Sequence, residues 1–412
     1  MGEALDQTLN APASAMPTSY ADISRAADAL LPLVAAEADE AERVYHQTDK
    51  VVDAFRKAGI YTMLGPRGNG GAELPYVDAM RIAERLCHAD GSAGWCAMVM
   101  NVHAASAGAF LPQKGIDIVY PNGADVLVAG QGVPRGYARA VDGGYMVKGL
   151  WSYGSGIWHA EWVHSGCFVM DGETMRRDAH GRPVVVVVHH PMADAELKGN
   201  WDVMGLRGTG SYDYGIKGGG EIFVPHHLCY WGENPPVERG GVQYAGGFVA
   251  MANWGHTSWA MGVGRRVLDE LAANARARTD VFGPLHKSTT FRAQFAEAEA
   301  KYRAGRALTY QSWEDLCESF AQGKAATVEQ FALIRLAMRH MHDVISEIST
   351  FAHRASRGAS LRPCRLQRAY RDIHSGTQHI LMADEIYAEC GHALLGTLGP
   401  NAKWTLLGLT DD

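Results

Sequence analysis

The feature that most constrains the fold is a change in the character of the chain, from helical to β-like and back to helical. Residues 21–121 repeat apolar residues at helical spacing. Residues 122–232 contain short runs rich in Val, Tyr and Phe that glycines separate, which is typical of strands and turns. Helical spacing returns in residues 241–412. This order predicts an α+β protein that is mainly α, with a helical domain, a central β-barrel or sandwich, and a helical bundle.

Composition and charge exclude several classes of partner. The net charge of −7 disfavours binding to nucleic acid or to an anionic membrane, and no apolar run is long enough to cross a bilayer. Residues 1–20 lack the basic start and apolar core of a signal peptide and are expected to form a disordered leader. The seven cysteines are scattered without a CxxC pair, which favours reduced thiols and a cytoplasmic location.

The sequence gives little support for a nucleotide site or a metal site. No GxGxxG follows a strand, so a Rossmann nucleotide site is not expected. The pairs His189-His190 and His226-His227 stand at the ends of predicted strands without a third ligand at recognisable spacing. We therefore predict that these histidines lie at the surface and that the chain has no metal site.

Aromatic and methionine side chains allow two interpretations. A stripe in the C-terminal part repeats at helical spacing and is predicted to be core: Ile334, Met338, Met341, Ile345 and Ile348. A second group either lines an apolar pocket for a ring system or belongs to the core of the helices: Trp95, Met98, Met100, Trp254 and Trp259. The sequence leaves these two possibilities open.

Four motifs in order resemble the acyl-CoA dehydrogenase fold. They are KAGIYTMLGPRGNGG (57–71), ADGSAGW (89–95), GLRGTGS (205–211) followed by a strand ending in Val-Pro, and RDIHSGTQHI (371–380). The resemblance covers about residues 21–396. It implies an N-terminal helical domain, a central β domain and a C-terminal four-helix bundle, usually assembled as a homotetramer.

The residue before Gly376-Thr377 distinguishes branches of that fold. Many of its dehydrogenases carry a glutamate there, which removes the α-proton of an acyl-CoA thioester, whereas this chain has Ser375. A neutral hydroxyl is too weak a base for that step. Some relatives place the base on an earlier helix, but the matching segment, 247–268, contains no Asp or Glu. The chain instead resembles the oxygenase components of two-component flavin-dependent monooxygenases, including their W-S-F-S-S-G-like segment, here WSYGSG (151–156), in which Gly154 replaces a serine.

That resemblance implies an enzyme that takes reduced FMN or FAD from a separate flavin reductase. Oxygen then forms a C4a-hydroperoxide that oxidises an aromatic or polycyclic small molecule. Two alternatives stay open: an acyl-CoA dehydrogenase with FAD and a non-standard base, and a catalytically silent assembly or binding protein on the same fold.

The resemblance also assigns site residues. The catalytic residues are His379, beside the flavin; His103, which holds or deprotonates the substrate hydroxyl; and Ser155, which bonds the flavin N5 region. The implied cofactor-binding residues are Trp151, Ser152, Ser155, Gln131, Arg207, Gly208, Thr209 and Thr377. The implied substrate-lining residues are His103, Trp95 and Trp254.

Several of these residues also have structural interpretations. In these interpretations, Ser155 is a turn residue and Trp151 belongs to the core of the β domain. His103 is then a hydrogen-bonded histidine of the core. Arg207 reaches either a flavin phosphate or an internal carboxylate such as Asp202. His374 competes with His379 for the position facing the flavin.

Overall fold

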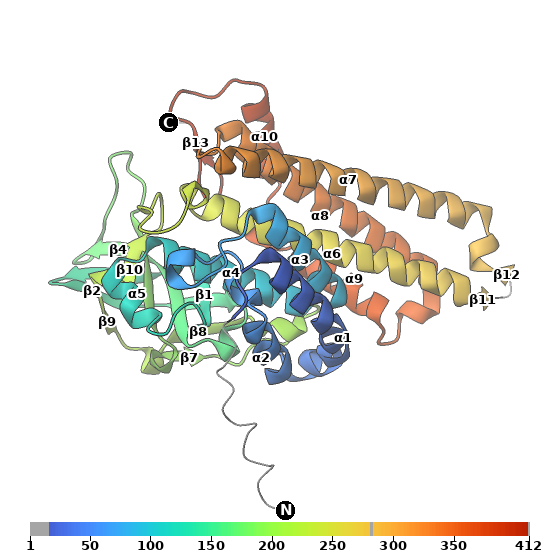
Figure 1. Ribbon diagram of the computed structural model, residues 1–412, viewed down its shortest axis with the longest axis horizontal. Helices are drawn as coiled ribbons and strands as arrows, with labels where there is room; N and C mark the ends of the chain where they lie inside the picture. Colours follow the sequence, from blue (N-terminus) through green and yellow to red (C-terminus); the bar gives the residue numbers. More distant parts are fainter. Residues whose placement is uncertain (1–15, 281–282, 411–412) are drawn as a thin grey trace, which may run out of the picture.

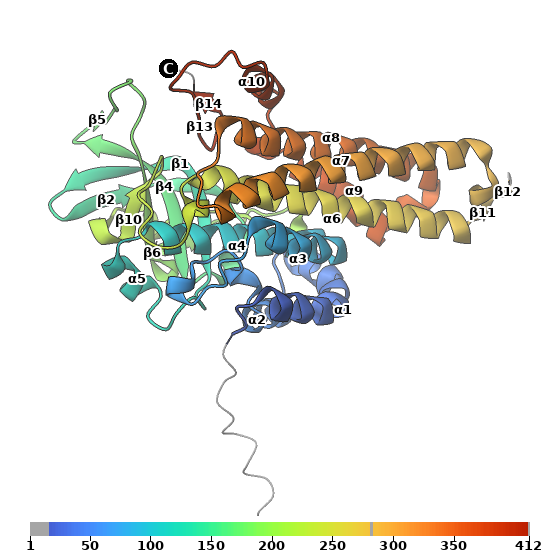
Figure 2. The same ribbon diagram turned by 45° about the horizontal axis from the view of Figure 1, so that its top comes forward.

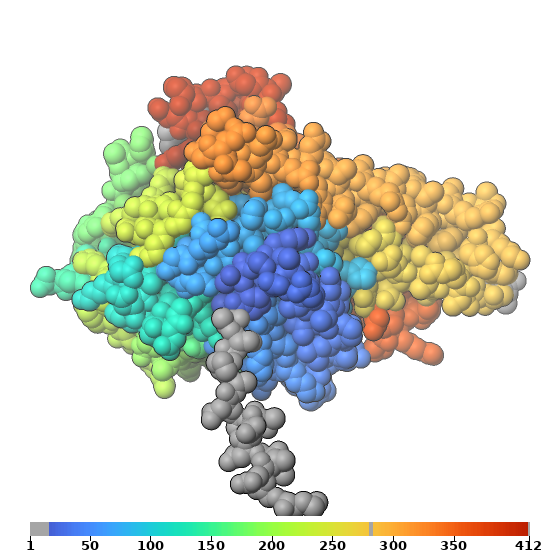
Figure 3. Space-filling view, in the orientation of Figure 1, coloured from blue at the N-terminus to red at the C-terminus, as the bar shows by residue number. Residues whose placement is uncertain are grey.

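The computed structural model describes residues 16–280 and 283–410. Residues 1–15 of the predicted leader lie outside the described residues. The predicted order of a helical part, a β part and a helical bundle is confirmed (Figure 1). Figure 3 shows the N-terminal helices, in blue, lying against both the β part, in green, and the bundle, in yellow and orange.

The N-terminal part consists of helices, one of which is almost fully buried. That helix, α4, begins at Gly91 because the Asp90 side chain accepts a hydrogen bond from the Ala93 N–H and caps it. Its side chains are buried nearly all round, as its apolar sequence predicts. The helices are α1 (Tyr20–Val44), α2 (Asp49–Lys57), α3 (Tyr76–Ala89), α4 (Gly91–Phe110) and α5 (Gln113–Val119).

The central part contains a seven-stranded sheet and a three-stranded sheet. The larger has the order β10-β6-β4-β1-β2-β9 with β5 beside β4, and the smaller has the order β3-β8-β7. Asp142 and Gly143 form the two-residue turn between β1 and β2, since Val141 pairs with Gly144. The strands are β1 (Val128–Val141), β2 (Gly144–Lys148), β3 (Leu150–Gly154), β4 (Trp162–Asp171), β5 (Thr174–Met175), β6 (Val185–Pro191), β7 (Ala195–Leu197), β8 (Tyr212–Ile216), β9 (Ile222–Pro225) and β10 (Cys229–Trp231).

The C-terminal part is a bundle of long helices that extends away from the sheets (Figure 2). The stripe predicted from Ile334 to Ile348 is buried core, which confirms the prediction. The helices are α6 (Phe248–Ala277), α7 (Thr289–Ala321), α8 (Val328–Ser356), α9 (Arg365–Gly376) and α10 (Glu385–Leu394). Short strand pairs are β11 (Thr279–Asp280) with β12 (Gly283–Pro284), and β13 (Lys403–Trp404) with β14 (Leu409–Thr410).

Candidate active site

The end of α9 places His379 beside α4 and α6. The helix ends at Gly376, where a Cβ atom would lie 2.3 Å from the ring of Trp259, so only glycine permits this close approach. The helix therefore breaks at this residue. The chain then turns, and the His379 ring lies against Trp95 of α4 and His256 of α6, with ring centroids 5.9 Å and 4.1 Å away.

The backbone fixes the tautomer of His379. Its Nδ1 accepts a hydrogen bond from the Leu381 N–H at 3.2 Å. In the neutral ring the proton therefore sits on Nε2, which is a donor without a hydrogen-bond partner among residues 16–280 and 283–410. Although the residue is only partly buried, desolvation of the ring lowers the pKa of His379 to about 4. The imidazole is therefore neutral at pH 7.

Ser155 follows β3 and reaches the same aromatic cluster. Its Oγ accepts a hydrogen bond from Trp95 Nε1 at 3.1 Å and lies 2.6 Å from Ser211 Oγ. Trp95 therefore contacts both Ser155 and His379, which are 224 positions apart in a 412-residue chain. Ser155 is 5% exposed, so its hydroxyl is held in a nearly dry environment.

Two residues of this cluster were missed in the sequence. Ser211 closes the GLRGTGS motif, and its hydroxyl lies 2.7 Å from Thr209 Oγ1. His256 stands on α6, and its Nδ1 is buried without a partner in the described part of the chain. Ser211 could have been predicted from the GLRGTGS motif, whereas no motif in the sequence includes His256.

His103 belongs to a second group of buried rings, between α4 and the larger sheet. Its Nδ1 lies 3.3 Å from the Val128 carbonyl, which can only accept, so Nδ1 carries the proton and Nε2 is an acceptor. Burial lowers the pKa of His103 to about 4. Its ring stacks on His164 of β4 with centroids 4.5 Å apart, and His164 contacts His189 of β6 at 5.3 Å.

The predicted surface location of His189 and His190 is wrong, because both are buried. They stand on β6, which is an interior strand between β4 and β10. Their Nδ1 atoms lie beside the carbonyls of Leu228 and Pro191. His226 is exposed. No group of three metal-ligating side chains was found in the part of the chain that the structure describes.

Several predicted cofactor or substrate residues are held by internal contacts. Trp151 is fully buried, donates to the Gly166 carbonyl at 2.7 Å and stacks on Tyr214. Trp254 is fully buried and donates to the Tyr76 carbonyl at 3.1 Å. Both indoles therefore occupy the protein core.

Arg207 is paired within the protein. Its guanidinium forms an ion pair with Asp202 at 3.1 Å, donates to Tyr45 Oη at 2.6 Å and covers the Tyr45 ring. The internal carboxylate of Asp202 is therefore one partner of Arg207.

Four further predicted residues lie on the elements that lead to this cluster: Gln131 on β1, Ser152 on β3, Gly208 in the turn before β8 and Thr377 after α9. Gln131 donates through Nε2 to the Ser152 carbonyl at 3.4 Å and so joins the start of β1 to β3. Gly208 is buried, with a Cβ position only 3.1 Å from the side chains of Ala41 and Ser92. Thr377 forms the C-cap of α9.

His374 lies away from this cluster. Its Nε2 is 3.1 Å from Ser349 Oγ of α8, and its ring contacts Tyr370, whereas His379 contacts Trp95. The geometry therefore favours His379 over His374 as the histidine of the candidate site.

The buried carboxylate near this cluster has a structural partner. Asp372 of α9 accepts a hydrogen bond from the Leu206 N–H at 2.6 Å and ties the helix to the turn before Thr209. Burial raises the pKa of Asp372 to about 7, and the nearby Asp90 adds to the effect. This contact fixes the turn that presents Thr209 and Ser211.

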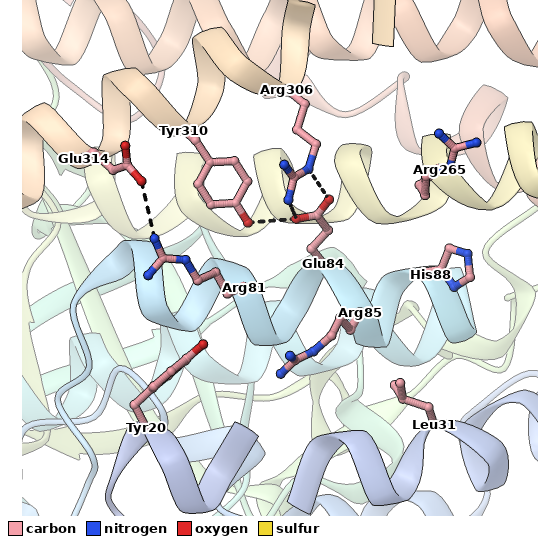
Figure 4. Close-up of a pocket in the computed structure, with 10 residues that line it drawn as sticks. All are labelled: Tyr20, Leu31, Arg81, Glu84, Arg85, His88, Arg265, Arg306, Tyr310 and Glu314. Carbon is pink, nitrogen blue, oxygen red and sulfur yellow. Dashed lines mark hydrogen bonds and ion pairs between the residues drawn. The ribbon is translucent and has the colours of Figure 1, made fainter. Parts of the chain in front are cut away.

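A surface groove of about 650 Å³ lies elsewhere, between α1, α3, α6 and α7 (Figure 4). Its arginines are paired with carboxylates of the protein: Arg306 with Glu84, Arg81 with Asp78, Arg85 with Asp28, and Arg265 with Glu299. None of the predicted site residues lines it. The groove therefore offers no unpaired cation for a phosphate and is separate from the candidate site.

Comparisons with known proteins identify the family. The acyl-CoA dehydrogenase N-terminal domain matches residues 21–111, and the acyl-CoA dehydrogenase C-terminal domain matches residues 254–384. The indole-3-acetate monooxygenase of Pseudomonas putida is 31% identical over 363 residues, which cover 87% of this chain and 89% of that protein. The chain belongs to the flavin-dependent monooxygenase branch of the acyl-CoA dehydrogenase family.

Other members of the family agree over the same length. The flavin-dependent monooxygenase oxygenase subunit HsaA of Rhodococcus jostii is 27% identical over 370 residues, covering 85% of this chain and 92% of that one. The solved structure of XiaF from Streptomyces sp. in complex with FADH2 and glycerol has a TM-score of 0.81 at 22% identity, covering 93% of this chain and 97% of that one. This monooxygenase therefore shares the full fold of the family. Among its described residues, no helix is both long and apolar enough to cross a membrane.

Proposed function

We propose that this monooxygenase is the oxygenase component of a two-component system that oxidises a small indole-like or phenolic aromatic compound. The observation that carries the proposal is the meeting of Ser155 and His379 at Trp95, in a site without a carboxylate at position 375. The names of the relatives, one an indole-3-acetate monooxygenase, support an aromatic substrate. A separate flavin reductase supplies the reduced flavin by diffusion or in a transient complex.

The residues at the loops around Trp95 suit a flavin. Ser155 Oγ and His379 Nε2 each retain hydrogen-bonding capacity that no described residue uses. Ser155 and Thr377 would hold the flavin together with the backbone of Ser152. When bound, reduced FMN or FAD supplies two electrons to O2, so that one oxygen atom enters the substrate and the other leaves as water.

His379 serves as a neutral hydrogen-bond donor. The Leu381 N–H occupies Nδ1, so Nε2–H points its proton away from the backbone. Because burial keeps the pKa near 4, the ring does not become charged at neutral pH, and it orients an oxygen-containing group without releasing a free proton. The aromatic rings of Trp95 and Trp259 help to exclude water from this site.

His103 serves as the hydrogen-bond acceptor for the substrate. Its Nδ1–H is used by the Val128 carbonyl, so the lone pair of Nε2 accepts a phenolic O–H or an indole N–H. For a phenol, a shift of that proton toward Nε2 makes the ring of the substrate more electron-rich and easier to oxidise. A buried acceptor of this kind favours substrates that bring a donor and rejects analogues that lack one.

The test is to mix the protein and chemically reduced FMN or FAD with isotopically labelled O2, in the presence of indole-3-acetate, indole or a simple phenol. We expect an oxygenated product that contains one labelled atom for at least one substrate. Binding of neither flavin, with no oxygenated product, would support the catalytically silent alternative. The Ser375→Glu variant tests the acyl-CoA dehydrogenase alternative, and we expect it to gain no activity on acyl-CoA thioesters.

The assembly and the location are part of the same proposal. The bundle of long helices is the surface through which this fold usually forms homotetramers, and light scattering would measure the mass in solution. All seven cysteines are free, which supports a reducing, cytoplasmic environment.

A further inference from the structure

A chain of hydroxyl groups runs from Ser155 into the protein. Trp95 Nε1 donates to Ser155 Oγ at 3.1 Å, and Ser155 Oγ lies 2.6 Å from Ser211 Oγ. Ser211 Oγ lies 2.7 Å from Thr209 Oγ1, and Thr209 Oγ1 lies 2.8 Å from the Leu206 carbonyl oxygen. All three hydroxyl residues are at most 5% exposed, so water does not compete for these contacts.

The carbonyl at the inner end sets the direction of every hydrogen bond. A carbonyl oxygen only accepts, so Thr209 donates its single hydroxyl hydrogen to the carbonyl of Leu206. Thr209 Oγ1 must then accept from Ser211, and Ser211 in turn must accept from Ser155. The opposite direction would bring lone pairs of Thr209 and Leu206 together at 2.8 Å. The Leu206 carbonyl also accepts from Trp201 Nε1, at the longer distance of 3.2 Å.

This direction determines what Ser155 can offer a ligand. A serine hydroxyl has one hydrogen and two lone pairs. Its hydrogen is committed to Ser211, and one lone pair is committed to Trp95. Only one lone pair remains, so Ser155 faces the site as an acceptor. If the chain ran the other way, both lone pairs would be used and Ser155 would face the site as a donor.

We propose that the Leu206 carbonyl, acting through Thr209 and Ser211, fixes Ser155 as an acceptor and so selects reduced flavin over oxidised flavin. The inference rests on the proposed function, in which Ser155 meets the flavin N5 region. Reduced flavin carries a hydrogen on N5 and is a donor there, whereas oxidised flavin offers only a lone pair. An acceptor therefore pairs with the reduced form and opposes the oxidised form. Ser211, Thr209 and Trp95 are positioning residues in this arrangement.

The redox preference suits an enzyme that receives its flavin already reduced. Oxidised flavin leaves such a site readily, and reduced flavin can replace it. The hydroxyl chain thus gives a physical reason for release of the spent cofactor, built from residues of α4, the loop after β3 and the turn before β8.

The test measures dissociation constants for oxidised flavin and, without oxygen, for reduced flavin, using both FMN and FAD. We expect the wild-type protein to bind the reduced form more tightly. Ser211→Ala frees the Ser155 hydrogen to turn toward the ligand, so oxidised flavin should bind more tightly than in the wild type. The ratio of the dissociation constant for oxidised flavin to that for reduced flavin should fall about tenfold. This is the effect of one hydrogen bond that oxidised flavin lacks in the wild type and gains in the variant.

Thr209→Val is the second variant, because it removes the link to the Leu206 carbonyl while keeping the shape of the side chain. Ser211 is then free to donate to Ser155, and the preference for reduced flavin should fall further. Ser312→Ala is the matched control, since Ser312 is a buried hydroxyl of α7 that donates to the Leu308 carbonyl, and it should leave the ratio unchanged.

A loss of affinity that is equal for both redox forms, or an unchanged ratio in both variants, would overturn the inference. Structural damage alone would not tighten the binding of oxidised flavin. If the wild-type protein bound neither form of either flavin, the proposed function itself would fail. If it bound reduced flavin and formed product while the ratio stayed unchanged in the variants, only the role of the hydroxyl chain would fail.

Discussion

The two proposed catalytic histidines are alike in pKa but opposite in the hydrogen bonds they offer. His379 receives a backbone N–H at Nδ1, so its Nε2 is a donor. His103 gives its Nδ1–H to a backbone carbonyl, so its Nε2 is an acceptor. Burial lowers the pKa of each ring to about 4, and both are neutral at pH 7. The backbone partner, rather than the residue type, therefore decides the chemistry of each site.

The substitution with the largest expected effect is His379→Ala. It removes the donor, and we expect oxygenated product per reduced flavin consumed to fall by roughly a hundredfold, as for loss of one positioned hydrogen-bond donor in an active site. His379→Gln keeps an N–H donor that does not titrate and should restore part of the yield. His374→Ala is the control, because that ring lies against Ser349, and an equal loss of product there would contradict the assignment.

His103→Gln tests the other half of the comparison. The amide can still accept a hydrogen bond from the substrate but cannot take its proton, so kcat should fall about tenfold or more while KM changes little. Steady-state kinetics on a phenol and on its methyl ether would measure this. The ether lacks the donor, and its poor turnover should be the same in wild type and variant. An equal fall of kcat for both compounds would show that His103 acts only in packing.

A substitution at Gly376 should displace His379 while leaving its imidazole ring unaltered. Gly376→Ala would put a Cβ atom 2.3 Å from the Trp259 ring, so the end of α9 must move. We expect the free energy of unfolding to fall by about 1–3 kcal/mol, the usual cost of overpacking a core. Gly391→Ala is the matched control in α10, where no atom lies within 4 Å of the added Cβ. That control should stabilise the helix by about 0.5–1 kcal/mol in denaturant titrations, and destabilisation equal to that of Gly376→Ala would count against the steric argument.

The sequence predicted the fold and the loops of the site because those depend on local patterns. The segments around Asp90, Ser155 and Gly376 all carry short motifs. The directions of the hydrogen bonds at His379 and His103 depend on backbone atoms that no motif encodes, and the path from Ser155 to Ser211 joins residues 56 positions apart. The surface prediction for His189 and His190 was wrong because strand order decides burial, and β6 pairs on both sides.

The pH dependence of the free energy of unfolding is a smaller effect. Buried histidines and the buried carboxylate contribute to it with opposite signs. His103 and His342 are buried, and each has a pKa lowered from 6.5 to about 4 by desolvation. Such a group contributes stability above pH 6.5 that is lost as the pH falls toward 4, because the unfolded chain binds the proton first. Asp372, whose pKa is raised from 3.8 to about 7, has the opposite sign: its contribution is present below pH 3.8 and is lost as the pH rises toward 7.

The His342→Phe variant measures what one buried histidine contributes to this pH dependence. The Nε2 of His342 is buried without a partner in the described chain. The slope of the free energy of unfolding between pH 6.5 and 4 should fall by about 1.4 kcal/mol per pH unit, which is the contribution of one proton. Denaturant titrations of both proteins at matched pH values measure the slopes. An unchanged slope would mean that His342 titrates in the folded protein as it does in the unfolded chain, and that burial does not govern its proton.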